Sequence, residues 1–376
     1  MSNVVGIIFS NIHDKNVPEL TKLRTMASVP FGCRYRLIDF TLSNMVHSGI
    51  EHVGVITHYN YQSLMDHLGS GKSWDLARRS GGIQILPPFI TAFANSESTL
   101  YTTRLEALRN SISFISGCTE DYVVLSDCDV ICNIDLSDMI ETHKNSGADA
   151  TMMIKKVYLT GGINGIYVTE SDNEDRLTSV MEYKERSGGY RDVCTNIWVM
   201  NRRFLESVVI DAEAHGYRSF INDIFQHGMD DYNINVYRHE GYFATVDSMQ
   251  SYYMCSMDLL NENVRHELFA NPGRPVLTKV RNSPPTVYAE GAKVQNSLIA
   301  DGCVINGTVE NSILFRGVRV GRNTHIKNSI LMQDTIVGEN SSLDAVITDK
   351  NAVIRDGRHL SGYATLPFYI GKYAQV

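Results

Sequence analysis

Short apolar runs alternate with stretches of helical periodicity from the start of the chain to about residue 260. The run "VVGIIF" at 4–9 is typical of a buried strand, and 136–145 carries apolar residues at helical spacing. This alternation predicts a mainly parallel α/β sheet with helices on both faces. Because ligands bind such sheets at the carboxyl ends of strands, we expect a site at the turns 10–16 and 127–135. The predicted strands are 4–9, 52–57, 122–126, 150–157, 165–169 and 196–201, and the predicted helices are 38–48, 60–68, 102–115, 136–145, 202–210 and 248–266.

The pattern changes in the last third of the chain. Residues 267–289 hold four prolines, which indicates a linker. After it, "NSL" at 296–298 is followed by "NSI" at 311–313 and 328–330 and by "DAV" at 344–346, with short valine and isoleucine steps between them. Such spacing predicts a left-handed parallel β-helix, with a β-sandwich as the alternative. The predicted domains are an α/β domain at 1–266, the linker at 267–289 and the β-helix at 290–376.

Composition narrows the class of protein. The chain has 376 residues, 43% of them hydrophobic and 20% charged, which suits a globular protein of two domains. A net charge of −8 argues against a general nucleic-acid binder. The seven cysteines are scattered without metal-ligand spacing, which indicates reduced thiols. With no membrane-spanning run and no signal-peptide layout, we expect a soluble, cytoplasmic protein.

The turn after the first strand raises a question about nucleotide binding. In α/β nucleotide-binding folds this turn is usually rich in glycine, so that backbone N–H groups can approach a phosphate. Here Ser10 to Asn16 contains no glycine. The sequence therefore predicts that this chain has no glycine-rich phosphate loop, either because the loop has been lost or because it was never present.

Five longer strings place the chain near a known family. The chain resembles the bacterial ADP-glucose pyrophosphorylases (glucose-1-phosphate adenylyltransferases), which join ATP and glucose 1-phosphate into ADP-glucose and pyrophosphate. The resemblance implies a Rossmann-like nucleotidyltransferase domain with a mainly parallel sheet, followed by a C-terminal left-handed parallel β-helix. The strings are "SVPFGCRYRLIDFTLSNMVHSGI" (28–50), "HLGSGKSWDL" (67–76), "GGIQILPPF" (81–89), "GYFATVDSMQSYYMCSMDL" (241–259) and "LTKVRNSPPTVY" (277–288).

The resemblance also implies which catalytic groups are missing. The reaction needs backbone donors, cations and Mg²⁺ on carboxylates to neutralise phosphate charge. The family's loop arginine falls near Asn16, its lysine on Met26 and its second metal aspartate on Thr245. Its first metal aspartate matches Asp129, so one metal ligand is kept and the other is lost. Each lost group is worth about 2–4 kcal/mol of transition-state stabilisation, and we expect no intact catalytic set.

The sugar-binding positions are better kept. Glu182 matches a family glutamate and Lys184 stands one residue late, while Asn196 replaces a glycine and Asp223 matches the end of an aspartate-containing string. Arg36 and Asp39 are equally well explained as ligand contacts or as a structural ion pair. Asp127 is explained as a loop carboxylate. The loop that reads Gly-Thr-Ala in the family is Thr103-Arg104-Leu105 in this chain.

Taken together, the chain most resembles the degenerate regulatory subunits of the family, the GlgD type. We expect it to require no cofactor itself, with Mg²⁺ serving a homologous catalytic subunit, and to join that subunit in a heterotetramer that sugar phosphates or nucleotides regulate. One alternative is an active enzyme in which Lys15, Lys22 or Arg24 replaces the lost cations. Another is a module that binds an effector without catalysis.

Overall fold

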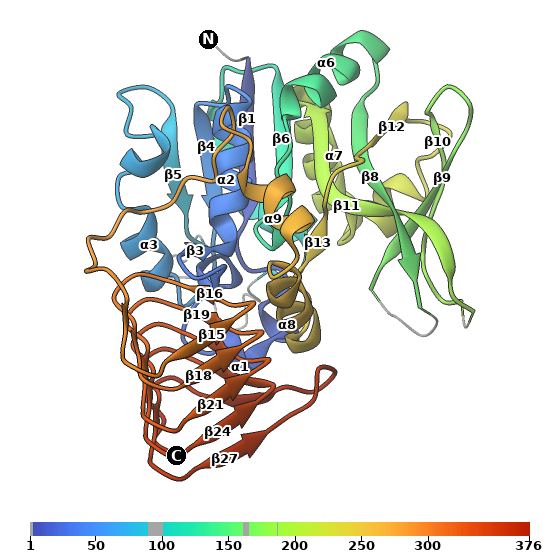
Figure 1. Cartoon of the computed structure of the whole chain (residues 1–376). Helices are drawn as coiled ribbons and strands as arrows, with labels where there is room; N and C mark the ends of the chain where they lie inside the picture. Colours follow the sequence, from blue (N-terminus) through green and yellow to red (C-terminus); the bar gives the residue numbers. More distant parts are fainter. Residues whose placement is uncertain (1–2, 89–100, 161–164, 186) are drawn as a thin grey trace. The chain divides into compact units, whose positions relative to one another are not determined.

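The computed structural model describes residues 3–88, 101–160, 165–185 and 187–376 (Figure 1). Its contacts divide the chain into two compact units, which we call the sheet unit and the β-helix unit. The segments 13–40 and 62–67 group with the β-helix, so the units do not follow the order of the chain. The linear boundaries at 266 and 290 stay a prediction. The sheet unit comprises Met1–Ile12, Thr41–Tyr61 and Leu68–Phe243, and the β-helix unit comprises His13–Phe40, Gln62–His67 and Ala244–Val376.

Four parallel strands form one half of the nine-stranded sheet, in the order β6, β1, β4, β5. All six residues of β1 are buried, as expected for a parallel strand that is covered on both faces. This half confirms the strands predicted near residues 4, 52 and 122. The bounds are β1 (Val4–Phe9), β4 (His52–Ile56), β5 (Gly82–Leu86) and β6 (Tyr122–Asp127).

The other half of the sheet is largely antiparallel. Strand β11 (Gly189–Asn201) runs against both β6 and β8 (Ala150–Leu159), while β12 (Ile234–Arg238) lies parallel to β8. Strands β9 (Tyr167–Ser171) and β10 (Leu177–Glu182) form a hairpin beside β11. The apolar pattern predicts where these strands lie but not their direction, because alternation along a strand is the same in both pairings.

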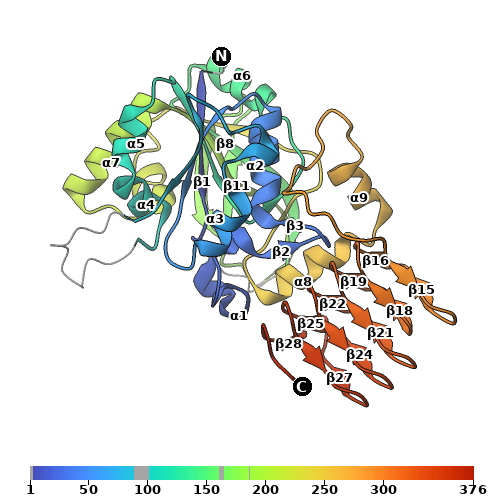
Figure 2. The ribbon, with the colours of Figure 1, turned by 90° about the vertical axis from the view of Figure 1, so that its left-hand side faces the viewer.

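The helices confirm most of the predicted set, with two breaks. Helices α4, α5 and α7 lie together on one side of the sheet in Figure 2, with α2 on the other. The predicted helix 102–115 ends at Ser111, which leaves the helical region, and 248–266 is divided where the Asn261 side chain caps α9 by accepting from the N–H of Asn263. The bounds are α2 (Leu37–His47), α3 (Gln62–Leu68), α4 (Arg104–Asn110), α5 (Ile112–Gly117), α6 (Leu136–Ser146), α7 (Arg202–His215), α8 (Met249–Asp258) and α9 (Glu262–Phe269).

The C-terminal coils form the predicted left-handed parallel β-helix. Three five-stranded parallel sheets make its faces, and their strands stack like rungs in Figures 1 and 2. A β-sandwich is excluded because neighbouring strands are parallel and come from successive coils. The sheets are β14 (Val287–Tyr288), β17 (Val304–Ile305), β20 (Arg319–Val320), β23 (Ile336–Val337), β26 (Val353–Ile354); β15 (Lys293–Gln295), β18 (Thr308–Glu310), β21 (His325–Lys327), β24 (Ser342–Asp344), β27 (His359–Ser361); and β16 (Leu298–Ile299), β19 (Ile313–Leu314), β22 (Ile330–Leu331), β25 (Val346–Thr348), β28 (Phe368–Ile370).

The Asn-Ser repeats form one corner of the β-helix. Asn311 and Asn328 adopt φ of 45° and 48°, a left-handed conformation that asparagine tolerates better than most residues. Each following serine lies in a hydrogen-bonded column: the hydroxyl of Ser312 accepts the N–H of Ser329 at 3.0 Å, and the hydroxyl of Ser297 accepts the N–H of Ser312 at 3.1 Å. The repeat therefore supplies both the turn conformation and the bonds along the stack.

The structure describes all seven cysteines as thiols outside any disulfide, and five of them are buried. Among the residues that the structure describes, no helix combines the length and the apolar character needed to cross a membrane.

Candidate functional site

The turn that follows β1 is held by side chains in place of a glycine loop. The N–H of Ser10 donates to the carbonyl of Ile56 at 3.0 Å, and the Asn11 amide oxygen accepts from the hydroxyl of Tyr101 at 2.9 Å. Further along, Asn16 is exposed at the end of a short 3-10 helix, Asp14–Asn16. The turn therefore contains ordinary polar contacts and, as its sequence shows, no glycine.

The other two replaced positions carry uncharged side chains. Met26 is completely buried, and its N–H donates to the Asp14 carboxylate at 2.7 Å. A cation at this depth would have to lose its hydration shell, whereas the apolar methionine side chain packs in the core without that cost. Thr245, in β13 (Ala244–Thr245), is partly buried, and its carbonyl accepts from the Cys255 thiol at 3.7 Å. A neutral hydroxyl is a poor ligand for Mg²⁺ compared with a carboxylate.

A buried pair of charges lies at the carboxyl end of β6. Asp127 and Asp129 are each 2% exposed, and the structure brings their carboxylates within 4.8 Å of one another. Arg104, the first residue of α4, donates to both oxygens of Asp127, with Nε at 2.8 Å from Oδ1. Burial favours the neutral form of Arg104, but the Asp127 carboxylate outweighs it and raises the pKa of the guanidinium. The sequence analysis did not predict this ion pair. The only indication of it in the sequence is that Arg104 stands where the family has a small residue.

The helix cap of α4 fixes the position of Arg104. The hydroxyl of Thr103 accepts the N–H of Glu106 at 3.3 Å, and the Glu106 carboxylate in turn accepts the N–H of Thr103 at 3.2 Å. Arg218 adds an ion pair to Glu106 at 2.6 Å. This reciprocal capping box holds the first turn of the helix, and with it the Arg104 side chain, over the end of β6.

Arg36 and Asp39 belong to one buried network of hydrogen bonds. Asp39 accepts the backbone N–H of Arg36 at 2.9 Å and meets His67 Nε2 at 2.6 Å. The Arg36 guanidinium donates to the carbonyl and hydroxyl of Ser63, at 2.6 and 3.0 Å. Burial lowers the pKa of Arg36 to about 10 and lowers the pKa of His67, although the bond to Asp39 opposes the change in His67. Asp39 therefore positions the segment that carries Arg36.

The remaining predicted sugar-binding residues have separate structural partners. Glu182 and Lys184 pair at 3.1 Å on the surface, where the hydrogen bond from Lys184 lowers the pKa of Glu182. Asn196 has a φ of 59° at an irregularity in β11, so asparagine takes over a conformation that suits glycine. Asp223 accepts the N–H groups of Arg218 and Ser219, both at 2.8 Å. A ligand role for these residues stays a prediction.

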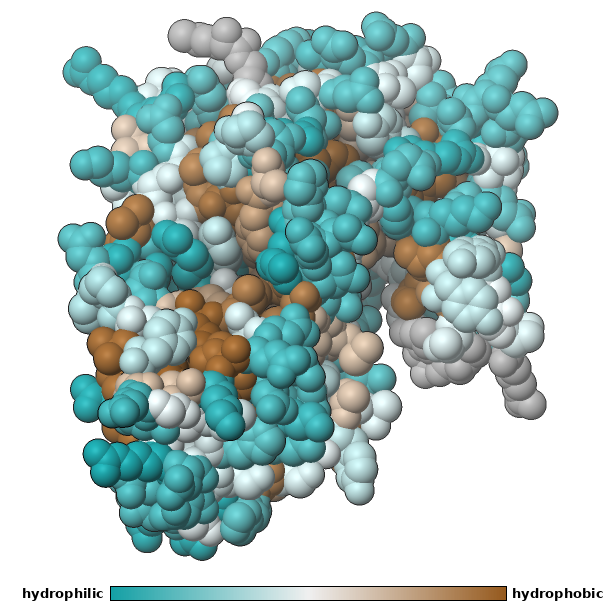
Figure 3. Space-filling model, viewed as in Figure 1, coloured by the Kyte–Doolittle hydropathy of each residue, from teal (hydrophilic) through white to brown (hydrophobic). Residues whose placement is uncertain are grey.

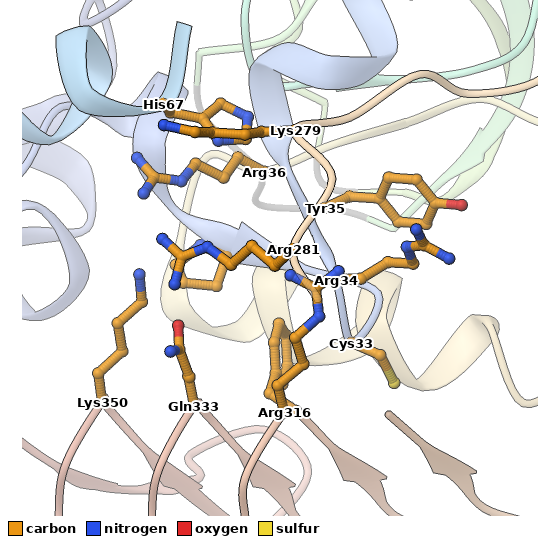
Figure 4. A pocket seen from close by; sticks show the side chains of 12 residues that line it. Cys33, Arg34, Tyr35, Arg36, His67, Lys279, Arg281, Arg316, Gln333 and Lys350 are labelled. Atoms are coloured by element: carbon orange, nitrogen blue, oxygen red, sulfur yellow. The ribbon is translucent and has the colours of Figure 1, made fainter. Parts of the chain in front are cut away.

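The β-helix unit holds a basic pocket that sequence reasoning did not find. Arg316, Gln333 and Lys350 occupy the same corner of successive coils, 17 residues apart. Figure 4 shows the charged ends of Arg36, Arg281 and Lys350 turned toward the same space. Burial, with help from neighbouring arginines, lowers the pKa of Lys350 to about 7. None of the lining residues that the structure describes is acidic; they are Pro30, Cys33, Arg34, Tyr35, Arg36, His67, Lys279, Arg281, Phe315, Arg316, Gln333 and Lys350.

A further arginine, Arg24, lies close to this pocket. Arg24 donates through Nη2 to both oxygens of Asp349 at 2.9 Å, and each side chain is 3% exposed. Of the three cations considered as replacements for the lost ones, Lys15 and Lys22 are exposed and Arg24 is engaged with Asp349. Arg24 is therefore paired with a carboxylate of the β-helix.

Comparison with known proteins agrees with both halves of the fold. Residues 15–262 match the nucleotidyl transferase family, and residues 286–363 match the GlmU-like C-terminal hexapeptide family. The chain is 34% identical to the glycogen biosynthesis protein GlgD of Bacillus subtilis, over 99% of this chain and 96% of that protein. It is 37% identical to the glucose-1-phosphate adenylyltransferase of Halalkalibacterium halodurans, over 95% and 93% of the two chains, and 32% identical to that of Thermotoga maritima, over 86% and 76%. The chain therefore belongs to the glucose-1-phosphate adenylyltransferase family of nucleotidyl transferases, which includes GlgD-type glycogen biosynthesis proteins.

Proposed function

We propose that this chain is a regulatory, catalytically deficient subunit of glucose-1-phosphate adenylyltransferase in glycogen biosynthesis. The observation that carries the proposal is Met26, a fully buried methionine at the position where the resemblance implies a lysine. Asn16 and Thr245 remove a further cation and a metal carboxylate. Because adenylyl transfer depends on neutralising phosphate charge, these three losses together argue against turnover by the isolated chain.

The proposed partner is a homologous catalytic chain, joined to this one as a cytoplasmic heterotetramer in which Mg²⁺ serves the partner's site. The first coil of the β-helix favours association, since Val287 and Tyr288 are each 55% exposed and Val294 is 39% exposed. Figure 3 shows hydrophobic surface over the first coils. To activate its partner, the chain must bind the active conformation more tightly than the inactive one.

The test compares ADP-glucose synthesis by this chain, by the catalytic homologue and by the co-expressed pair. We expect no turnover by this chain alone and a higher kcat or a lower KM for the pair than for the homologue. A matched control replaces this chain with its Arg355→Ala variant, which changes an exposed side chain outside the first coil. Robust Mg²⁺-dependent turnover by the isolated chain would refute the proposal and favour an active enzyme instead.

A second candidate function is the binding of a phosphorylated effector, and the basic pocket favours it. Six arginine and lysine side chains line the pocket together, and the buried Nη1 of nearby Arg24 has no hydrogen-bond partner among the described residues. Inorganic phosphate, glucose 1-phosphate and AMP are the probes, read out as a rise in Tm. Lys350→Ala should abolish the rise, whereas Arg322→Ala, an exposed change of the same charge outside the pocket, should preserve it. An equal rise in both variants would exclude this pocket as the site.

A further inference from the structure

Three side chains with metal-binding atoms meet at the amino-terminal ends of the parallel strands. They are His52, the first residue of β4, Cys118, which directly follows α5, and Glu120, which lies just before β6. One nitrogen, sulfur or oxygen atom from each residue lies within 4.8 Å of the other two. His52 and Glu120 are 68 positions apart in the sequence, so the fold brings them together. All three residues belong to the sheet unit.

The metal-binding atoms are shielded from solvent but can be reached from it. The side chains of His52 and Glu120 are 16% and 15% exposed, and Cys118 is 6% exposed. Nδ1 of His52 lies 3.0 Å from Oε1 of Glu120. The other ring nitrogen, Nε2, is buried and has no hydrogen-bond partner among the residues that the structure describes. Because buried polar atoms in folded proteins usually have a partner, this imidazole retains capacity for a ligand.

Neighbouring groups hold the three side chains in place. The His52 ring packs edge-on against Phe114, with ring centroids 5.2 Å apart. The Cys118 thiol donates to the carbonyl of Phe114 at 3.2 Å. Oε2 of Glu120 accepts the N–H of the preceding residue at 2.9 Å, and the carbonyl of Glu120 accepts from Nε of Arg202 at 2.6 Å. Contacts of this kind orient metal ligands before the ion binds.

The charges and the ligand types favour a zinc ion. Burial raises the pKa of the Cys118 thiol to about 11, and Glu120 adds to the rise, whereas Arg202, which pairs with Glu206 at 2.9 Å, opposes it. A divalent cation would displace the thiol proton and relieve the repulsion between thiolate and carboxylate. Sulfur and nitrogen ligands suit zinc, whereas Mg²⁺ and Ca²⁺ prefer oxygen. A hollow lined in part by His52 and Glu120 offers the ion a route from solvent.

We propose that His52, Cys118 and Glu120 form a Zn²⁺ site, with water from the hollow as the fourth ligand. On binding, the thiol releases its proton to solvent, and zinc forms bonds to the thiolate sulfur, one imidazole nitrogen and one carboxylate oxygen. The ion joins β4 to the segment before β6 across β1, which lies between these strands in the sheet. Its role is structural. It adds a metal ion to a chain expected to need no cofactor, and it is independent of the proposed regulatory function.

The experiment uses the full chain, cleared of metal with a chelator and titrated with Co²⁺ as an optical probe and then with Zn²⁺. We expect one Co²⁺ per chain, with a thiolate-to-cobalt charge-transfer band, and its displacement by Zn²⁺. Cys118→Ser should remove this band, and His52→Gln and Glu120→Gln should each weaken Zn²⁺ binding at least about tenfold. Zn²⁺ at a hundredfold excess over Kd should raise Tm by about 5 °C, because it binds only the folded chain.

Two matched controls separate the site from adventitious binding. Cys33→Ser changes a partly buried thiol outside the sheet unit, and His215→Gln breaks an exposed histidine–aspartate pair of 3.1 Å within it. Both variants should bind Co²⁺ like the unmodified chain. The inference is overturned if the unmodified chain shows no charge-transfer band, if Cys118→Ser keeps it, or if either His52→Gln or Glu120→Gln binds Zn²⁺ as tightly as the unmodified chain. The last two variants decide the matter if Cys118→Ser does not fold.

Discussion

The ion pair between Arg24 and Asp349 should contribute strongly to the stability of the β-helix unit. The two residues are 325 positions apart in the sequence, and the guanidinium contacts both carboxylate oxygens at 2.9 Å. Asp349 also accepts the hydroxyl of Tyr369 at 3.1 Å and the N–H of Lys350 at 2.6 Å. Arg24→Ala would leave this carboxylate buried, with two neutral donors as its remaining partners.

The magnitude follows from burial. Removing one member of a buried ion pair costs about 3–5 kcal/mol, because the remaining charge stays desolvated. The donors from Tyr369 and Lys350 offset part of this cost, so we expect a loss near the lower limit, about 3 kcal/mol. A change of that size corresponds to about a 150-fold rise in the rate of amide exchange through unfolding.

The assay is hydrogen exchange of the amides in β25 and β28, read by mass spectrometry. Local exchange suits a chain of two units, since global unfolding need not follow a single transition. Arg24→Ala should accelerate exchange in these strands, and Arg24→Ala with Asp349→Asn should recover most of the protection because the unpaired charge is gone. Arg355→Ala, an exposed change of the same type, serves as the control.

Two outcomes would refute this reasoning. Exchange in Arg24→Ala within a factor of about two of the Arg355→Ala control would mean that the pair adds little to stability. Equal acceleration in Arg24→Ala and in the double variant would mean that the cost comes from lost packing of the arginine, and not from the unpaired carboxylate.

Three further predictions concern single positions. Because the pKa of Lys350 is lowered to about 7, the protonated form that binds anions is lost above that pH. The affinity for sulfate, whose own charge is constant in this range, should therefore fall about fivefold from pH 7 to pH 8, as measured by calorimetry. Lys350→Ala should remove this pH dependence. Asn196→Val should lower the free energy of unfolding by about 1–2 kcal/mol in urea, since a β-branched residue is strained at positive φ, whereas Asn196→Gly should change it little. Ser312→Ala removes the acceptor of the Ser329 N–H and should accelerate exchange of that amide, at a cost of about 1–2 kcal/mol.

The sequence by itself determined the local structure and the missing groups. The apolar periods at 4–9, 52–57 and 122–126 predict strands that the structure confirms, because burial on both faces leaves a continuous apolar run. The Asn-Ser repeats predict the β-helix, because the corner needs a left-handed residue in every coil. The identities of Asn16, Met26 and Thr245 can likewise be read directly, once the surrounding strings fix the register.

Only the tertiary structure decided which charged groups meet. The pairing of Arg104 with Asp127 spans 23 residues and that of Arg24 with Asp349 spans 325, and neither leaves a periodic signal in the sequence. The basic pocket likewise brings Arg36, from the segment 13–40, together with Lys350 of the β-helix. The direction of β11 and the break at Ser111 were also beyond reach, since they depend on neighbours that are distant along the chain. Local periodicity indicates which face of a helix or strand is buried, whereas the partner of a buried charge depends on how distant segments pack together.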